Sequence, residues 1–232
     1  MDSDIWTGLA VFFGIVGVMF VAVVAACLWE KRPVQLYYVP AEGEEYKPSA
    51  VAEVANRDAK RLGFIHGGLC HDGKGKLYRV RYDFWLSPDH SMLAVIGSGS
   101  IARIPVNGIW LWSRMKDGRI FCTTNEIGEQ EICGLVEQRT WAKYSFEELL
   151  AKHEPRLSDE VEPFPTDSPL LGYFDIRRRK AEALVARGYA YYLDEEQKVW
   201  RYSLRGAVVF YFLGTWVRPI GRLLRSVGLV RE

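Results

Sequence analysis

The sequence has few cysteines, and they form no recognisable pattern. Only four of its 232 residues are cysteine, namely Cys27, Cys70, Cys122 and Cys133, and no CxxC pair occurs. This number and spacing exclude the disulfide framework of a small secreted domain. If a hairpin turns about Ile127-Gly128, Cys122 and Cys133 face each other across it, and in a cytoplasmic domain we expect both to stay reduced.

The sequence also lacks the short motifs of common active sites, including GxSxG, HExxH, Walker A and DxDxDG. The glycines of Val95–Ala102 have the spacing of a dinucleotide fingerprint, but Pro105 follows too soon for a pyrophosphate-binding helix, so we interpret them as a turn. His66, Cys70 and His71 lie in a Gly-rich stretch that we interpret as an exposed loop, because no second cluster completes a metal site. We expect no catalytic residue, metal or cofactor.

Charge is absent from Ile5 to Trp29. A helix of this length, at 1.5 Å per residue, measures roughly 37 Å and can cross a hydrocarbon core of about 30 Å with some tilt. Trp6 and Trp29 stand at its ends, where amphipathic rings prefer the head-group layer, and Lys31 and Arg32 follow it. We predict a transmembrane signal anchor.

The residues beside this segment predict its orientation. Asp2 and Asp4 precede it and basic residues follow it, so the positive-inside rule places the N-terminus outside the cell membrane and the remaining chain in the cytoplasm. A cleaved secretory signal fits less well, because its first residues should be basic and its apolar run shorter. Val24–Cys27 resembles a lipobox, which leaves open a lipoprotein with its domain outside.

One face of the predicted helix consists of small residues. Ala10, Gly14 and Gly17 lie on it at helical spacing, and small side chains allow another helix to approach closely. Glycine is common in membrane helices for other reasons as well. These three residues are the candidate helix-pairing surface, and the sequence leaves the oligomeric state open.

An α+β domain is predicted over 33–155. Val34–Val39 has the composition of a strand, and a helix over 49–62 is opened by Pro48 and closed by Gly63. The helix is predicted to cover the apolar face of an antiparallel β-meander, which sets the fold class as α+β.

Apolar residues that recur at every second position predict the strands of the meander. Tyr78, Val80, Tyr82 and Phe84 alternate with charged residues, which indicates a half-buried strand over 77–86 with a solvated face. Further strands are predicted at 92–96, 101–106, 109–115, 119–124 and 131–137, with turns at 87–90, 97–100, 116–119 and 127–128.

A short helix and a linker precede the C-terminal unit. Ser145 and Glu148 have capping-box spacing, and Pro155 ends the helix that they begin. The residues over 156–168 are rich in proline and acidic side chains, which predicts an extended linker. The last unit, 169–232, is predicted as helix, hairpin and helix.

This C-terminal unit, in LVARGYAYYLDEEQKVWRYSLRGAV, resembles the second half of a winged-helix domain. The resemblance covers the order of a recognition helix, a two-stranded wing and a last helix, and it implies DNA binding with phosphate contacts from Arg177–Lys180. The chain departs from the pattern because the preceding helix lies across a Pro-rich linker.

The C-terminal quarter is basic. From Ile176 onward there are 12 Lys and Arg against 5 Asp and Glu, whereas the preceding part has 18 against 24. Gly206–Val217 is uncharged but, at about 18 Å, too short to cross a bilayer, so it either lies in the membrane interface or packs into the protein core. The candidate membrane-interface residues are Trp6, Trp29, Lys31, Arg32, Arg205, Trp216, Arg218, Arg222 and Arg225.

These features favour a single-pass membrane-anchored, non-catalytic scaffold or accessory subunit with a cytoplasmic α+β domain. Its expected partners are membrane lipid and another protein in a membrane complex. The alternative is a membrane-tethered DNA-binding regulator that uses the winged-helix-like unit, and nucleic acid is the less favoured partner. An enzyme whose site forms from the meander loops is the third and weakest hypothesis.

Overall fold

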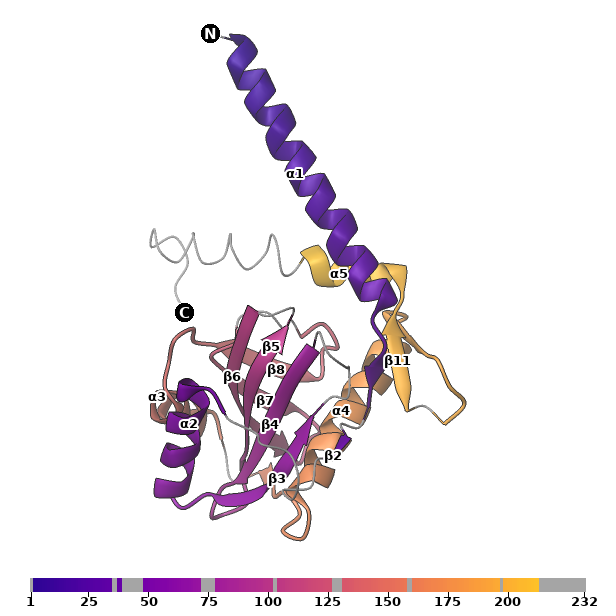
Figure 1. Cartoon of the computed structure of the whole chain (residues 1–232). Helices are drawn as coiled ribbons and strands as arrows, with labels where there is room; N and C mark the ends of the chain where they lie inside the picture. Colours follow the sequence, from indigo (N-terminus) through magenta and orange to yellow (C-terminus); the bar gives the residue numbers. More distant parts are fainter. Residues whose placement is uncertain are drawn as a thin grey trace. The chain divides into compact units, whose positions relative to one another are not determined.

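The protein, seen in a computed structural model, has two compact units (Figure 1). The structure describes residues 2–34, 37–38, 48–71, 78–101, 104–126, 131–157, 160–196 and 198–212. Met1–Arg32 and Leu184–Glu232 form the terminal unit, and Pro33–Ala183 forms the sheet unit. This division differs from the predicted boundaries, because most of helix α4 (Pro169–Ala186) belongs with the sheet.

The terminal unit begins with helix α1 (Asp2–Trp29), so the predicted N-terminal apolar helix is confirmed. Trp6–Trp29 is long and apolar enough to cross a membrane, and no other helix in the described ranges is. Arg32 begins the two-residue strand β1 (Arg32–Pro33).

The last part of the terminal unit contains a hairpin and a helix. Strands β10 (Ala190–Tyr192) and β11 (Val199–Tyr202) pair antiparallel. Helix α5 (Leu204–Phe212) follows, and its first turn is capped because the Ser203 hydroxyl accepts a hydrogen bond from the Gly206 N–H at 3.1 Å. Gly206 lies so close to the Tyr189 backbone that no side chain fits there.

The sheet unit contains a mixed sheet in the order β2-β3-β4-β5-β6-β7-β8, with β9 paired to β6. Its strands are β2 (Tyr37–Tyr38), β3 (Ile65–His71), β4 (Tyr78–Leu86), β5 (Leu93–Ile101), β6 (Ile104–Met115), β7 (Ile120–Thr124), β8 (Val136–Thr140) and β9 (Val161–Glu162). The α+β class is therefore confirmed, with adjacent strands antiparallel except for β7 and β8. The stretch predicted as a loop around His66 and His71 is instead strand β3.

Two predicted turns are confirmed. The Ser87 N–H donates to Met92 O at 2.9 Å and closes the turn between β4 and β5. The Met115 N–H donates to Arg119 O at 2.9 Å and closes the turn between β6 and β7, where Gly118 has a φ of +90°. Pro88 in the first turn and Gly118 in the second are residue types that such turns favour.

The turn predicted at 97–100 is wrong. Strand β5 runs without a break to Ile101, and Gly97 pairs with Gly108 of β6. The physical reason is Trp110, whose ring lies over both glycines: a Cβ added at Gly97 would stand 2.8 Å from its Cζ3 atom. These glycines leave space for a large ring rather than bend the chain.

The predicted hairpin about 127–128 is also wrong. Strand β8 pairs with β7 in the parallel direction, and Cys122 lies opposite Gln138 rather than Cys133. Residues 127–130 of the connection lie outside the described residues. After them, the side chains of Ile132 and Cys133 are buried. All four cysteines are reduced and buried.

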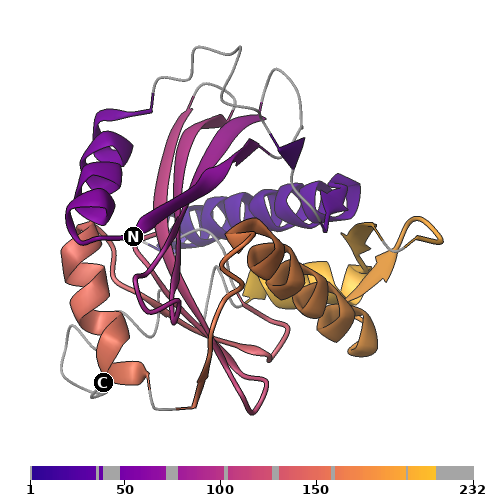
Figure 2. The same ribbon diagram turned by 90° about the horizontal axis from the view of Figure 1, so that it is seen from below.

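Helices cover both faces of the sheet (Figure 2). Helix α2 (Ala50–Arg61), which begins at the N-cap Ser49, packs Ala52, Ala55 and Ala59 in one buried cluster with Trp85 and Leu111. Helix α3 (Phe146–His153), with the predicted capping box confirmed, adds its apolar side chains to the same cluster and continues into the short 3-10 helix η1 (Glu154–Arg156).

Helix α4 covers the opposite face, where the Tyr173 ring stands 5.1 Å from that of Phe84. The predicted cover is therefore corrected: the helix at 49–62 packs on the face expected to be solvated. Two features allow that face to be buried. Trp85 is an apolar residue on the face that otherwise carries the charged residues of β4, and Asn56 of α2 donates a hydrogen bond to the Asp83 carboxylate at 3.1 Å. The alternation of residues in β4 therefore belongs to a strand that is covered on both faces, not on one.

The packing of Trp110 yields a stability prediction. Gly108→Ala places a methyl group against the Trp110 ring, and overpacking of this kind costs about 1–3 kcal/mol in the free energy of unfolding. Trp110→Leu in the same chain should recover most of that loss, so a double-mutant cycle by urea unfolding should show strong coupling. Ser100→Ala, also in β5, is the control and should change stability little. Additive effects of Gly108→Ala and Trp110→Leu would contradict the packing role.

Candidate functional site

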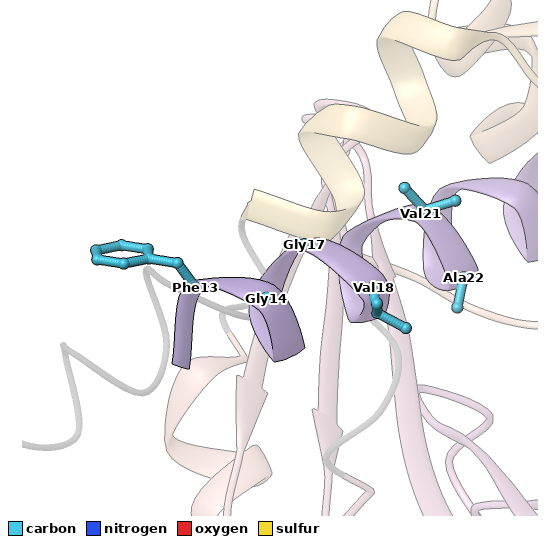
Figure 3. Close-up of a pocket in the computed structure, with 6 residues that line it drawn as sticks. All are labelled: Phe13, Gly14, Gly17, Val18, Val21 and Ala22. Atoms are coloured by element: carbon cyan, nitrogen blue, oxygen red, sulfur yellow. The ribbon is translucent and has the colours of Figure 1, made fainter. Parts of the chain in front are cut away.

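A shallow apolar groove runs along one side of α1 (Figure 3). Its lining residues are Phe13, Gly14, Gly17, Val18, Val21 and Ala22. A Cβ added at Gly14 or Gly17 would meet nothing within 4 Å, so no described part of the chain covers these glycines. The groove includes two of the three residues of the predicted helix-pairing surface, and Ala10 is exposed one turn before it. Helix pairing stays a prediction.

The predicted membrane-interface residues are placed as follows. Trp6 and Trp29 are among the most exposed side chains of α1, and Lys31 is exposed after it. Arg32 is not free: it forms an ion pair with Glu30 at 2.7 Å. Trp216, Arg218, Arg222 and Arg225 lie outside the described residues.

Two arginines of this set, Arg32 and Arg205, contact aromatic rings within the terminal unit. The Arg32 guanidinium lies 4.9 Å from the ring centroid of Tyr202 and 5.5 Å from that of Trp200. Arg205 lies 5.2 Å from the ring centroid of Tyr189. At these distances the ring faces attract the guanidinium groups electrostatically.

Helix α5 packs against α1 within the terminal unit. The rings of Phe20 and Tyr211 meet edge to face at 5.0 Å, and the Tyr211 hydroxyl lies 3.5 Å from Val16 O. Val24 and Cys27 are buried on α1. The sequence alone did not pair these helices, because they are separated by the entire sheet unit.

The basic cluster at 177–180 is engaged within the sheet unit. Arg177 donates hydrogen bonds to the carbonyls of Pro33 and Val34 at 2.6 and 2.9 Å, and Arg179 donates to Gly118 O at 2.7 Å. These guanidinium groups hold main-chain segments together. Their predicted phosphate contacts stay a prediction.

The other two basic side chains of the cluster are paired with carboxylates. Arg178 binds Asp175 and Glu182 on the exposed side of α4. Lys180 pairs with Glu131 and lies 5.2 Å from the Trp112 ring centroid. The Lys180–Glu131 pair is the more significant one, because both side chains are largely buried.

Cys133 shares this buried site. Its thiol donates to the Glu131 carboxylate at 3.0 Å. Burial and the neighbouring Glu131 charge raise the pKa of the Cys133 thiol to about 11. A thiol so protonated is a poor nucleophile, so Cys133 has the character of a structural side chain.

The one buried histidine is held by hydroxyl groups. His153 Nδ1 lies 2.8 Å from Thr123 Oγ1, and Nε2 lies 3.0 Å from Ser113 Oγ. Ser113 donates onward to Ser91 O at 2.8 Å, and Arg156 donates to Thr123 Oγ1 at 2.8 Å. These directions give Thr123 a proton to donate to Nδ1 and place the histidine proton on Nε2.

This arrangement has the residue types of a nucleophile and base but not their setting. Ser113 and His153 have no solvent exposure, and the Ser113 proton is committed to a backbone carbonyl. Burial, and then the Arg156 charge, lower the pKa of His153 to about 3. The neutral imidazole therefore ties α3 to β6 and β7 and does not face substrate.

The remaining Ser, Asp and His side chains of the sheet unit do not assemble into a site. Ser87, Asp89 and Ser91 hydrogen-bond one another inside their turn; burial opposes ionisation of Asp89, but these hydrogen bonds outweigh it and lower the pKa of the carboxyl. His66 lies 3.4 Å from Asp83 on the face that α2 covers. In the described ranges no three His, Cys, Asp or Glu side chains gather as metal ligands.

The His153 network predicts a pH dependence of stability. Between about pH 6.5 and 3 the unfolded chain binds a proton at this histidine that the folded chain excludes, so the free energy of unfolding falls as pH drops, by up to about 1.4 kcal/mol per pH unit. His153→Gln cannot take that proton and should flatten the profile. Urea unfolding of the detergent-solubilised chain at pH 7, 6 and 5 measures both slopes, and parallel profiles would count against the buried neutral histidine.

The basic cluster predicts an unequal response to substitution. Lys180→Met leaves Glu131 buried without its partner and should lower the free energy of unfolding by about 3 kcal/mol. Arg178→Ala removes exposed pairs and should cost less than about 1 kcal/mol. Chemical denaturation of the two variants in the same detergent makes the comparison. Equal, small losses would show that Lys180 is not a buried structural cation.

Comparison of the chain with protein-family models, with curated proteins and with solved structures finds no match.

Proposed function

We propose that the protein is a single-pass membrane-anchored, non-catalytic scaffold or accessory subunit, with α1 in the bilayer and the α+β domain in the cytoplasm. The observation that carries the proposal is the exposure of α1. Ten large apolar side chains project from it: Trp6, Leu9, Val11, Phe12, Phe13, Ile15, Val18, Met19, Val21 and Trp29.

Water is a poor environment for this helix. Burying a large apolar side chain is worth about 1.5–3 kcal/mol, so ten partly exposed ones would cost roughly 10–20 kcal/mol in water. A folded domain is stable by only about 5–15 kcal/mol in total. Lipid removes this cost along the full length of the helix, and an uncharged helix flanked by Trp6 and Trp29 suits a bilayer.

The orientation follows from charge. Lys31 and Arg32 follow the helix and acidic residues precede it, which supports a cytoplasmic location for the sheet unit. The Cys27 lipoprotein alternative places the same unit outside, and Cys27 is buried in the terminal unit. Burial of Cys27 favours the anchor.

The non-catalytic part of the proposal is supported by the sheet unit. Its buried His153 and Cys133 are held in structural contacts, and its faces are covered by α2, α3 and α4. A domain of this kind presents its outer surfaces to a partner. The DNA-binding alternative receives no support from the basic cluster, since Arg177, Arg179 and Lys180 already have partners inside the sheet unit.

The anchor is tested by fractionation. The full-length chain should remain with membranes after an alkaline carbonate wash, and a chain lacking residues 2–29 should be released. Leu193→Cys lies on the exposed hairpin, so an impermeant maleimide should label it only after the cells are opened. Labelling of Leu193→Cys in intact cells would reverse the orientation, and release of the full-length chain by carbonate would remove the anchor.

The scaffold role is tested by the composition of the purified protein. A full-length chain extracted in mild detergent should copurify with a stoichiometric protein partner, and the Lys180→Met chain, if it unfolds, should lose it. Duplex DNA should bind the wild-type chain no better than it binds a chain with the exposed Arg178 replaced by alanine. Salt-sensitive DNA binding that depends on Arg177 or Arg179 would favour the regulator instead.

A further inference from the structure

Helix α5 contacts α1 far from its C-terminal end at Trp29. Tyr211 is buried, its ring is 5.0 Å from Phe20, and its hydroxyl points to Val16 O. Phe20 and Val16 lie nine and thirteen residues before Trp29. At 1.5 Å per residue, these contacts stand about 13 and 20 Å along the helix from Trp29.

That distance fixes the depth of α5 once α1 is placed in a bilayer. With Trp29 at the head-group boundary, half of the hydrocarbon thickness is about 15 Å, so the Tyr211 contacts lie near its centre. A helix that lies in the interface is buried by only about 5–10 Å. Such a helix would not reach Val16.

The start of α5 has a different chemistry from its end. Arg32 stacks on Tyr202 and Arg205 stacks on Tyr189, and Tyr202 comes just before the helix. Basic and aromatic side chains together are typical of the head-group layer. From Gly206 to Phe212 the helix carries no charge.

Polar groups at the start of α5 and at Tyr211 have hydrogen-bond partners, as hydrocarbon requires. Ser203 caps the first turn, and the Tyr211 hydroxyl has a carbonyl of α1 within reach. The Phe212 side chain is 52% exposed and that of Leu204 is 62% exposed, and no described part of the chain covers either. Apolar side chains left open on such a helix suit acyl chains.

We infer that α5 is a second intramembrane segment, which enters the bilayer from the cytoplasmic side and packs on the middle of α1. Its nine residues, Leu204–Phe212, measure about 13 Å, less than half of the hydrocarbon thickness. The occupant of its outer face is the hydrocarbon of the lipid. This inference rests on the proposed position of α1 in the membrane, and it replaces the interfacial placement of this segment with a deeper one.

Depth-dependent quenching tests the inference on the full-length chain in phosphatidylcholine–phosphatidylglycerol vesicles. Phe212→Cys and Leu204→Cys each carry a bimane fluorophore, and the acyl chains are brominated either near the head group or near the chain end. The wild-type chain is the blank, because its four cysteines are buried. Phe212→Cys should be quenched most by the deep bromines, and Leu204→Cys most by the shallow ones.

Two further positions separate this inference from the proposed function. Val18→Cys, on an exposed position of α1, should be quenched by the deep bromines, and Leu193→Cys, on the hairpin, by neither. If Val18→Cys is quenched and both α5 positions respond equally and only to shallow bromines, α5 lies on the surface and the inference is wrong. If Val18→Cys is not quenched at all, the anchor itself fails.

Discussion

The structure depends on how one uncharged helix is covered. Ten large apolar side chains of α1 are exposed, whereas Val24 and Cys27 of the same helix are buried. In the proposed position of α1, lipid covers these side chains and removes a free-energy cost comparable with the stability of an ordinary domain. The proposed orientation and the proposed depth of α5 both follow from that position.

Local signals allowed much of the fold to be predicted. The uninterrupted apolar stretch, the capping box at Ser145, the proline turn at Ser87 and the glycine turn at Gly118 each act within a few residues, and each is found in the structure. Such signals need no knowledge of distant contacts. They fixed the α+β class but not the order of the sheet.

The errors arose where distant residues decide. Gly97 was interpreted as a turn because nothing nearby in sequence indicates that Trp110 needs its space, and Cys133 was placed opposite Cys122 because a parallel return of the chain leaves no short-range mark. The main-chain partners of Arg177 were not foreseen for the same reason: the carbonyls of Val34 and Pro33 lie 143 and 144 residues before it in the sequence. The pairing of α1 with α5 was beyond sequence reasoning altogether.

The terminal unit is assembled from the two ends of the described chain, and this has a consequence for its biosynthesis. The ribosome releases Arg32 about 150 residues before Leu184, which at roughly 5–20 residues per second corresponds to about ten seconds or more. During that interval α1 exists without α5, and the sheet unit can fold before its neighbour is complete. A nascent chain that stalls before Leu204 would therefore carry a folded sheet unit and an α1 helix without its α5 partner.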